Sequence, residues 1–99
     1  MAKKIIIYWR DIPSQVLVQS GRTRQKSHLS ERFMQAIDRA AMRAGKGSSD
    51  AYLAEWRREA SACDGGDLQA IADAEAKRLE SEYSDERLLE LIRGHGSAE

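Results

Sequence analysis

Apolar residues near the start of the chain cluster in the way that is typical of β-strands. Residues 4–10 and 14–19 are rich in Ile, Val, Tyr and Trp, which favour pleated backbone, and residues 11–14, with Pro13, indicate a turn between them. The two segments therefore predict a β-hairpin. Pairing Trp9 with Val16 would give one face with Ile5, Ile7, Trp9, Val16 and Val18, and a second face with Ile6, Tyr8 and Leu17.

Three later segments carry apolar residues at helical spacing. The first is expected to begin after Ser30 and to end at Gly45, the second begins after Asp67, and the third runs from Ser84 to residues 93–94. Ser and Asp are favourable N-cap residues, because their side-chain oxygens accept hydrogen bonds from the free backbone N–H groups of the first turn. Residues 95–99 are expected to form a frayed tail.

Two segments are harder to assign. Residues 22–28 are polar and basic, which favours a linker. Residues 50–58, DAYLAEWRR, combine good helix formers with alternating Tyr52, Ala54 and Trp56. We favour a strand, because a hairpin alone is marginally stable and a third strand would complete a sheet. The sequence then predicts one α+β domain over residues 1–94, in the order β-β-α-β-α-α, with helices on one face of a small antiparallel sheet.

Composition favours a single globular domain that is charged but neutral overall. The 99 residues are 41% hydrophobic and 32% charged, with a formal net charge of zero. Residues 1–58 hold 12 Lys or Arg and 5 Asp or Glu (+7), whereas residues 59–99 hold 4 and 11 (−7). Folding could pair these charges internally or leave a basic face and an acidic face. Without an export signal or an apolar run long enough for a membrane span, we expect a cytoplasmic protein.

The segment KKIIIYWRDIPSQVLVQSGR, then DAYLAEWRR after one helix, and a helix ending in RLESEY resemble the small virulence-factor domain family. That family also supplies the C-terminal domain of conserved virulence factor C, and the present chain is similar to its stand-alone bacterial form. The resemblance brings no established catalytic residues. Similar members are often encoded near corrinoid and folate one-carbon methyl-transfer proteins, which implies an accessory subunit of such a multi-protein system.

The sequence contains few groups suited to catalysis or metal binding. Cys63 is the only cysteine, and the two histidines, His28 and His95, fall in the expected linker and tail. Neither a CxxC nor an HxxxH spacing occurs. We therefore expect no catalytic residue, cofactor or metal, although a small enzyme stays an alternative if a concave pocket gathers titratable groups.

Binding to another protein is the function that the residues favour. The second face of the expected sheet and its arginines have the Tyr, Trp and Arg composition typical of interfaces. The candidate residues for binding a protein partner, or a second copy of the chain, are Tyr8, Arg10, Leu17, Tyr52, Trp56, Arg57 and Arg58.

Nucleic-acid binding is a less favoured alternative. Arg22, Arg24 and Lys26 could hold phosphates beside Tyr8 on the sheet. The chain lacks the aromatic-rich segment of RNA-recognition motifs, and its pI is about 6.7.

Overall fold

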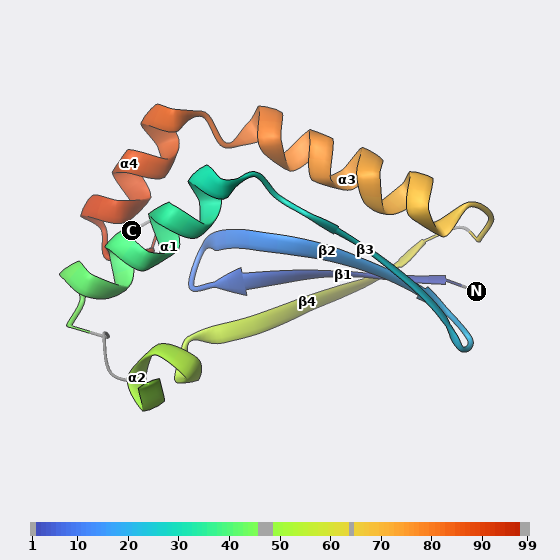
Figure 1. Ribbon diagram of the computed structural model, residues 1–99, viewed down its shortest axis with the longest axis horizontal. Coiled ribbons are helices and arrows are strands. Elements are labelled where there is room, and N and C mark those ends of the chain that lie inside the picture. The colour runs from blue at the N-terminus through green and yellow to red at the C-terminus, as the bar shows by residue number, and fades with distance from the viewer. Residues whose placement is uncertain (1, 46–48, 64, 98–99) are drawn as a thin grey trace.

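The computed structural model describes residues 2–45, 49–63 and 65–97, and these form an antiparallel sheet covered by helices on one side (Figure 1). The strands lie in the order β3-β2-β1-β4. They are β1 (Ala2–Trp9), β2 (Ile12–Ser20), β3 (Thr23–His28) and β4 (Trp56–Cys63), and the helices are α1 (Glu31–Arg43), α2 (Ser49–Ala54), α3 (Leu68–Glu82) and α4 (Asp85–Arg93). The predicted α+β class is confirmed, with the element order β-β-β-α-α-β-α-α.

The expected linker at residues 22–28 is a strand. β3 pairs with β2 across a tight turn in which Gly21 has a φ of +59°, a conformation that glycine adopts without strain. Nearly every residue of β3 is exposed, so no buried alternation marks it in the sequence. Backbone pairing and α3 hold it in place, and the Gln69 side-chain amide donates to the Lys26 carbonyl oxygen at 3.3 Å.

The segment 50–58 divides between two elements. Residues up to Ala54 form α2, in agreement with their helix propensity, and the strand begins only at Trp56. β4 then continues to Cys63, beyond the segment expected from the sequence. The third strand of the prediction is therefore present but displaced along the chain, and it pairs with β1 as an edge strand.

The hairpin has a different register from the expected one. Trp9 pairs with Ile12 instead of Val16, while Ile6 pairs with Val16 and Ile5 with Leu17. Up to Ile7 the observed partners differ from the expected ones by three residues, an odd number, so Ile5 and Ile7 no longer share a face with Val16 and Val18. A β-bulge between Ile7 and Tyr8 places Pro13 within β2, where a proline is tolerated beside such an irregularity.

The main core lies between the sheet and helices α1, α3 and α4. Its fully buried side chains include Trp9 and Ile12 at the end of the hairpin and Phe33 and Ile37 on α1. Phe33 also makes an edge contact with Tyr83, their ring centroids being 5.9 Å apart. Ile5 and Leu17 are buried but do not belong to this core, because they lie on the opposite face of the sheet.

The helix starts predicted from the sequence are confirmed, although one cap works differently. The Asp67 carboxylate accepts from the Ala70 backbone N–H, and the Ser84 hydroxyl accepts from the Arg87 N–H, both at 3.1 Å. Ser30 precedes α1 without capping it and instead donates its hydroxyl to Glu80 of α3 at 2.9 Å. The start of α1 is thereby joined to the end of α3.

Residues 95–97, which the sequence places in a frayed tail, are held against the sheet. The Gly96 N–H donates to the Leu91 carbonyl at 2.7 Å, and the Gly96 carbonyl accepts from the Asp11 N–H at 2.8 Å. Arg10 donates to the His95 carbonyl at 2.8 Å. Gly96 is buried on the ring of Trp9, so the turn after α4 closes one end of the core; residues 98–99 lie outside the described part of the chain.

This packing predicts that Gly96→Ala destabilises the fold more than Gly45→Ala does. Both glycines have positive φ, +94° and +73°, so each substitution strains the backbone. A Cβ at Gly96 would also lie 2.8 Å from Cζ3 of Trp9, whereas one at Gly45 meets nothing within 4 Å. We expect Gly45→Ala to lower the free energy of unfolding by about 1–2 kcal/mol and Gly96→Ala by about 1–3 kcal/mol more, measured by urea denaturation. Equal losses would contradict the packing of Gly96 on Trp9.

Candidate functional site

The face of the sheet opposite the main core is left open by helices α1, α3 and α4 (Figure 1). Lys4 faces α3, because its Nζ contacts the Glu75 carboxylate at 3.1 Å, so its neighbours Lys3 and Ile5 point to the other side. Paired residues share a face, which extends the assignment across the sheet. The open sheet face consists of Lys3, Ile5, Ile7, Gln15, Leu17, Gln19, Arg24, Lys26, His28, Arg58, Ala60 and Ala62.

Figure 1 shows how this face is left free. Helices α1, α3 and α4 lie on one side of the sheet, and the short α2 lies at its Trp9 end, away from these three helices. At the centre of the open sheet face, Ile5 pairs with Leu17, and both are 8% exposed. Across the sheet, Ala60 of β4 lies opposite Ile5 and Lys26 of β3 lies opposite Leu17. The face therefore has a small aliphatic centre, and a hollow of about 280 Å³ at its edge is lined in part by Lys3, Ala60 and Ala62.

Positive charge surrounds that centre. Lys3, Arg24, Lys26 and Arg58 are exposed, and the open sheet face carries no Asp or Glu. Among the residues that the structure describes, none of these four cations forms an ion pair. The open sheet face thus holds cations that no carboxylate of the described residues pairs.

On the helix side of the sheet, by contrast, several charged residues form ion pairs with one another. Glu75 of α3 is almost buried, with a side-chain exposure of 8%, and it accepts from Lys4 at 3.1 Å and from Arg78 Nε at 2.9 Å. The hydrogen bond from Arg78, followed by that from Lys4, holds the pKa of Glu75 below its usual value. Arg32 likewise contacts Glu80 and Asp85, each at 3.1 Å. Part of the charge asymmetry of the sequence is therefore neutralised on this side of the sheet.

The seven residues predicted to bind a protein partner do not form one surface. Leu17 and Arg58 lie on the open sheet face. Tyr8 and Arg57 lie on the helix side, and Arg10, Tyr52 and Trp56 gather around Trp9. The changed register and the division of residues 50–58 into α2 and β4 account for this separation.

Comparison with known proteins identifies the family. The family model described as virulence factor matches residues 7–92. The chain belongs to the virulence factor family. No curated protein and no solved structure matches the chain. The matched range runs from β1 to α4, so it includes Leu17, Arg24, Lys26 and Arg58 of the open sheet face.

Tyr8 and Arg57 of this virulence factor domain line a cleft of about 280 Å³, together with Asp11, Glu59, Tyr83, Arg87 and Leu91. The guanidinium of Arg57 stacks over Tyr8 at 4.5 Å and that of Arg87 over Tyr83 at 4.4 Å. Burial raises the pKa of both tyrosines, so they remain protonated at neutral pH. The cleft therefore offers hydrogen-bond donors and stacked cations rather than a phenolate base.

Arg57 also neutralises the carboxylates of this cleft. It contacts Asp11 at 3.1 Å and pairs with Glu59. Burial opposes its charge, but the hydrogen bonds with Glu59 and Asp11 outweigh that effect and raise its pKa. Arg57 therefore connects the β1–β2 turn to β4.

Arg10, Tyr52 and Trp56 stabilise the end of the sheet. The Trp9 indole N–H donates to the Tyr52 carbonyl at 2.9 Å, and the two rings stack with centroids 5.9 Å apart. Trp56 meets Tyr52 edge-on at 5.7 Å. Arg10 lies over Trp9 and contacts Glu55 at 3.1 Å. These contacts attach α2 to the sheet, which is a structural role.

The residues of the nucleic-acid alternative are only partly brought together. Arg24 and Lys26 lie on the open sheet face, but Arg22 lies in the turn between β2 and β3. Tyr8 lies on the helix side of the sheet. The structure therefore separates the basic residues Arg24 and Lys26 from Tyr8, the ring expected to stack on a base.

Sequence reasoning missed Lys3, Ile5 and Ile7 as members of this surface, because the expected register assigned Ile5 and Ile7 to the core. A usable signal was present in residues 22–28, where Arg24, Lys26 and His28 recur at every second position. That period places three basic side chains on one face of a strand. Residues 2–45, 49–63 and 65–97 contain neither a cluster of potential metal ligands nor a helix long and apolar enough to cross a bilayer.

Adjacent lysines on opposite faces give a matched stability test. We expect Lys4→Gln to lower the free energy of unfolding by about 1–2 kcal/mol, because the almost buried Glu75 loses one of its two cationic partners. Lys3→Gln should change it by less than about 0.5 kcal/mol, since exposed Lys3 has no ion pair among the described residues. Urea denaturation of both variants at pH 7 measures the difference. Equal effects would contradict the assignment of the two faces.

The same carboxylate predicts how stability depends on pH. Because the folded pKa of Glu75 lies below 4.5, its contribution is complete above that value and is lost as the pH falls through the folded pKa. Glu75→Gln should therefore be less stable than wild type at pH 7, and its stability should fall less steeply between about pH 5 and pH 3. Thermal denaturation across that range tests this. Parallel curves would show that Glu75 does not contribute.

Proposed function

We propose that this virulence factor domain is a non-enzymatic interaction module whose open sheet face binds an acidic surface of a partner protein. The observation that carries the proposal is the set of four exposed cations, Lys3, Arg24, Lys26 and Arg58, around an aliphatic centre on a face without a carboxylate. Charges that the fold leaves unpaired remain available to complementary groups on another molecule.

The shape of the face favours a protein over a small ligand. A small ligand is usually enclosed by a concave pocket, whereas the open sheet face spreads its side chains over four strands, with a hollow of about 280 Å³ at its edge beside Lys3, Ala60 and Ala62. Ile5, Ile7 and Leu17 can contribute apolar contact at its centre, and the surrounding cations can fix orientation through charge-assisted hydrogen bonds. This arrangement of an apolar centre and a polar rim is common in protein interfaces.

The positive charge of the open sheet face argues against a second copy of the chain as the partner. In a two-fold symmetric dimer each patch meets the same patch, so the four cations of one copy would face the four cations of the other. Such a contact is electrostatically unfavourable. The proposed partner is therefore a different protein with an acidic surface, as expected if this domain is an accessory subunit. Its one-carbon methyl-transfer context and its cytoplasmic location stay predictions from the sequence.

Nucleic acid is a second candidate because Arg24, Lys26, Lys3 and Arg58 could also contact phosphates. The open sheet face contains no Phe, Tyr or Trp, and its one ring is the imidazole of His28, so base stacking there would rest on that side chain alone. Binding would then rest on the phosphate backbone and fall steeply with salt.

The test compares two double variants that each remove two positive charges. Lys26→Gln/Arg58→Gln changes the open sheet face, whereas Arg22→Gln/Lys77→Gln changes exposed residues in the β2–β3 turn and on α3. We expect the first pair to reduce capture of protein partners at least about tenfold, measured by affinity capture and quantitative mass spectrometry. The second pair should leave capture within about twofold of wild type, and neither should change the melting temperature.

Equal capture by wild type and the Lys26→Gln/Arg58→Gln variant would refute the proposed surface. Labelled single-stranded and duplex oligonucleotides provide the second arm of the test. Binding that falls steeply between low and high salt, and that is lost in the same variant, would assign the face to nucleic acid instead.

A further inference from the structure

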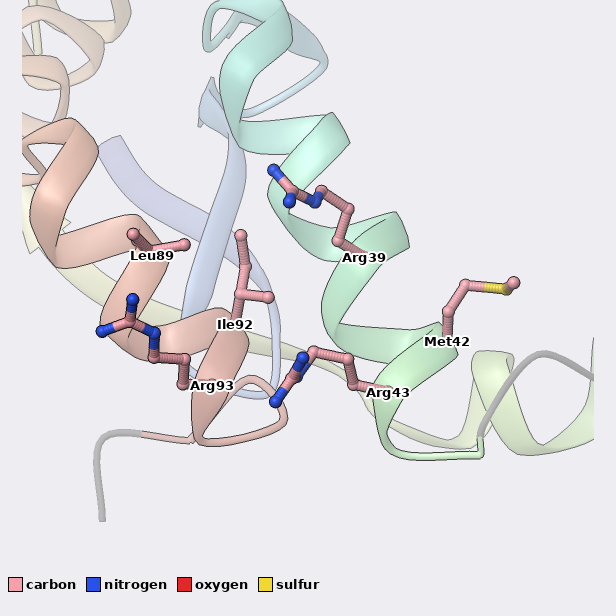
Figure 2. Close-up of a pocket in the computed structure, with 6 residues that line it drawn as sticks. All are labelled: Arg39, Met42, Arg43, Leu89, Ile92 and Arg93. Atoms are coloured by element: carbon pink, nitrogen blue, oxygen red, sulfur yellow. The ribbon is translucent and has the colours of Figure 1, made fainter.

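A second unpartnered surface lies on the helix layer, between α1 and α4. It is a groove of about 530 Å³, and Figure 2 shows the six residues that line it: Arg39, Met42, Arg43, Leu89, Ile92 and Arg93. In that view Arg43 extends toward α4, and Ile92 points toward α1. The groove therefore has an aliphatic floor between two arginine-bearing helices.

The groove continues toward the beginnings of both helices. A further hollow of about 230 Å³ shares Arg39, Leu89 and Ile92 with it and reaches Arg32 on α1 and Asp85 on α4. The beginnings of the helices thus lie together, as do their ends, so α1 and α4 run in the same direction. From Arg32 to Arg43 the lining of α1 spans about 16 Å, which is about three turns of helix.

The groove combines exposed apolar surface with unpaired positive charge. Met42 is 74% exposed and Leu89 is 38% exposed, although both are large hydrophobic residues. Within the described residues, Arg39, Arg43 and Arg93 form no ion pair. Arg43 and Arg93 lie in the last turns of their helices, where a cation offsets the helix dipole. Arg39 lies a full turn earlier on α1, where the helix dipole does not account for a positive charge.

We propose that this groove binds an acidic amphipathic helix of a partner protein. Carboxylates on both flanks of such a helix would meet the three arginines, and its apolar stripe would cover Leu89 and Ile92. Methionine and arginine are enriched in protein interfaces, and a flexible Met42 can adapt to the partner.

The backbone requirements of the occupant favour a helix over an extended segment. The groove is lined by the side chains of two helices, whose own backbone groups are hydrogen-bonded internally, so it offers no strand edge for pairing. A helix satisfies its own backbone and needs only side-chain contacts. A small anion would be held poorly, because the arginines are spread over two helices and the floor between them is aliphatic.

The proposal is independent of the open sheet face. The groove residues lie on α1 and α4, on the other side of the sheet from Lys26 and Arg58 (Figure 1). Loss of one surface by substitution leaves the other intact, so the two proposals can fail separately.

The experiment uses a fluorescein-labelled acidic peptide of about four helical turns, with Leu at helical spacing on one face and Glu elsewhere. We expect saturable binding to the wild-type chain by fluorescence anisotropy. Arg39→Gln/Arg43→Gln/Arg93→Gln should weaken binding at least about tenfold, and Leu89→Ser by about threefold or more. The matched comparison sets Arg39→Gln/Arg43→Gln, which should also weaken binding, against Arg22→Gln/Lys77→Gln, which removes two exposed charges from the β2–β3 turn and α3, outside both proposed surfaces, and should retain affinity within about twofold. Circular dichroism and melting temperature verify that all variants are folded.

Several results would overturn the proposal. The first is no saturable binding by the wild-type chain, and the second is equal binding by the two matched double variants. The third is equal binding of a peptide in which Ser replaces every Leu, which would indicate unspecific charge attraction. Binding to vesicles containing anionic phospholipid, without binding to the peptide, would assign the groove to a membrane surface instead.

Discussion

The pairing of Ile6 with Val16 and of Ile5 with Leu17 is the constraint on which the rest of this structure depends. It sends Ile6, Val16 and Val18 toward the helices and leaves Ile5 and Leu17 on the open sheet face. Because side chains alternate along a strand, any odd shift would exchange these sets and expose the core. The bulge beyond Ile7 then changes the course of the hairpin, whose end buries both Trp9 and Ile12.

The fold also converts a charge asymmetry along the sequence into one between layers. On the helix side, Glu75 and Glu80 are paired with Lys4 and Arg32, and these contacts bring the basic first half of the chain against the acidic second half. On the open sheet face the cations have no carboxylate beside them. Lys3 and Lys4, adjacent in sequence, thus have opposite roles: one remains available to solvent and partners, and the other stabilises a buried carboxylate.

The chain is a small domain of the virulence factor family, with two surfaces proposed to bind partners. The open sheet face and the α1–α4 groove are both cationic with an apolar centre, and they lie on different layers of the molecule. Binding at one would not block the other. The Tyr8–Arg57 cleft and the aromatic contacts around Trp9 instead join separate parts of the chain, through stacking and ion pairs that are satisfied within the fold.

By itself the sequence determined the α+β class, the N-terminal hairpin, the three long helices with their starting residues, and a surface rich in arginine, because these follow from local periodicity and capping chemistry. Only the tertiary structure decided the register of the β1–β2 hairpin. The expected and observed pairings differ in which side chains pack against the helices, and those helices are distant in sequence. It also decided that residues 22–28 form a strand, because β3 is held by pairing with β2 and contact with α3 rather than by its own apolar residues. The separation of Tyr8 from Leu17 and the meeting of Arg39, Arg43 and Arg93 at one groove likewise depend on contacts between elements, which no local pattern encodes.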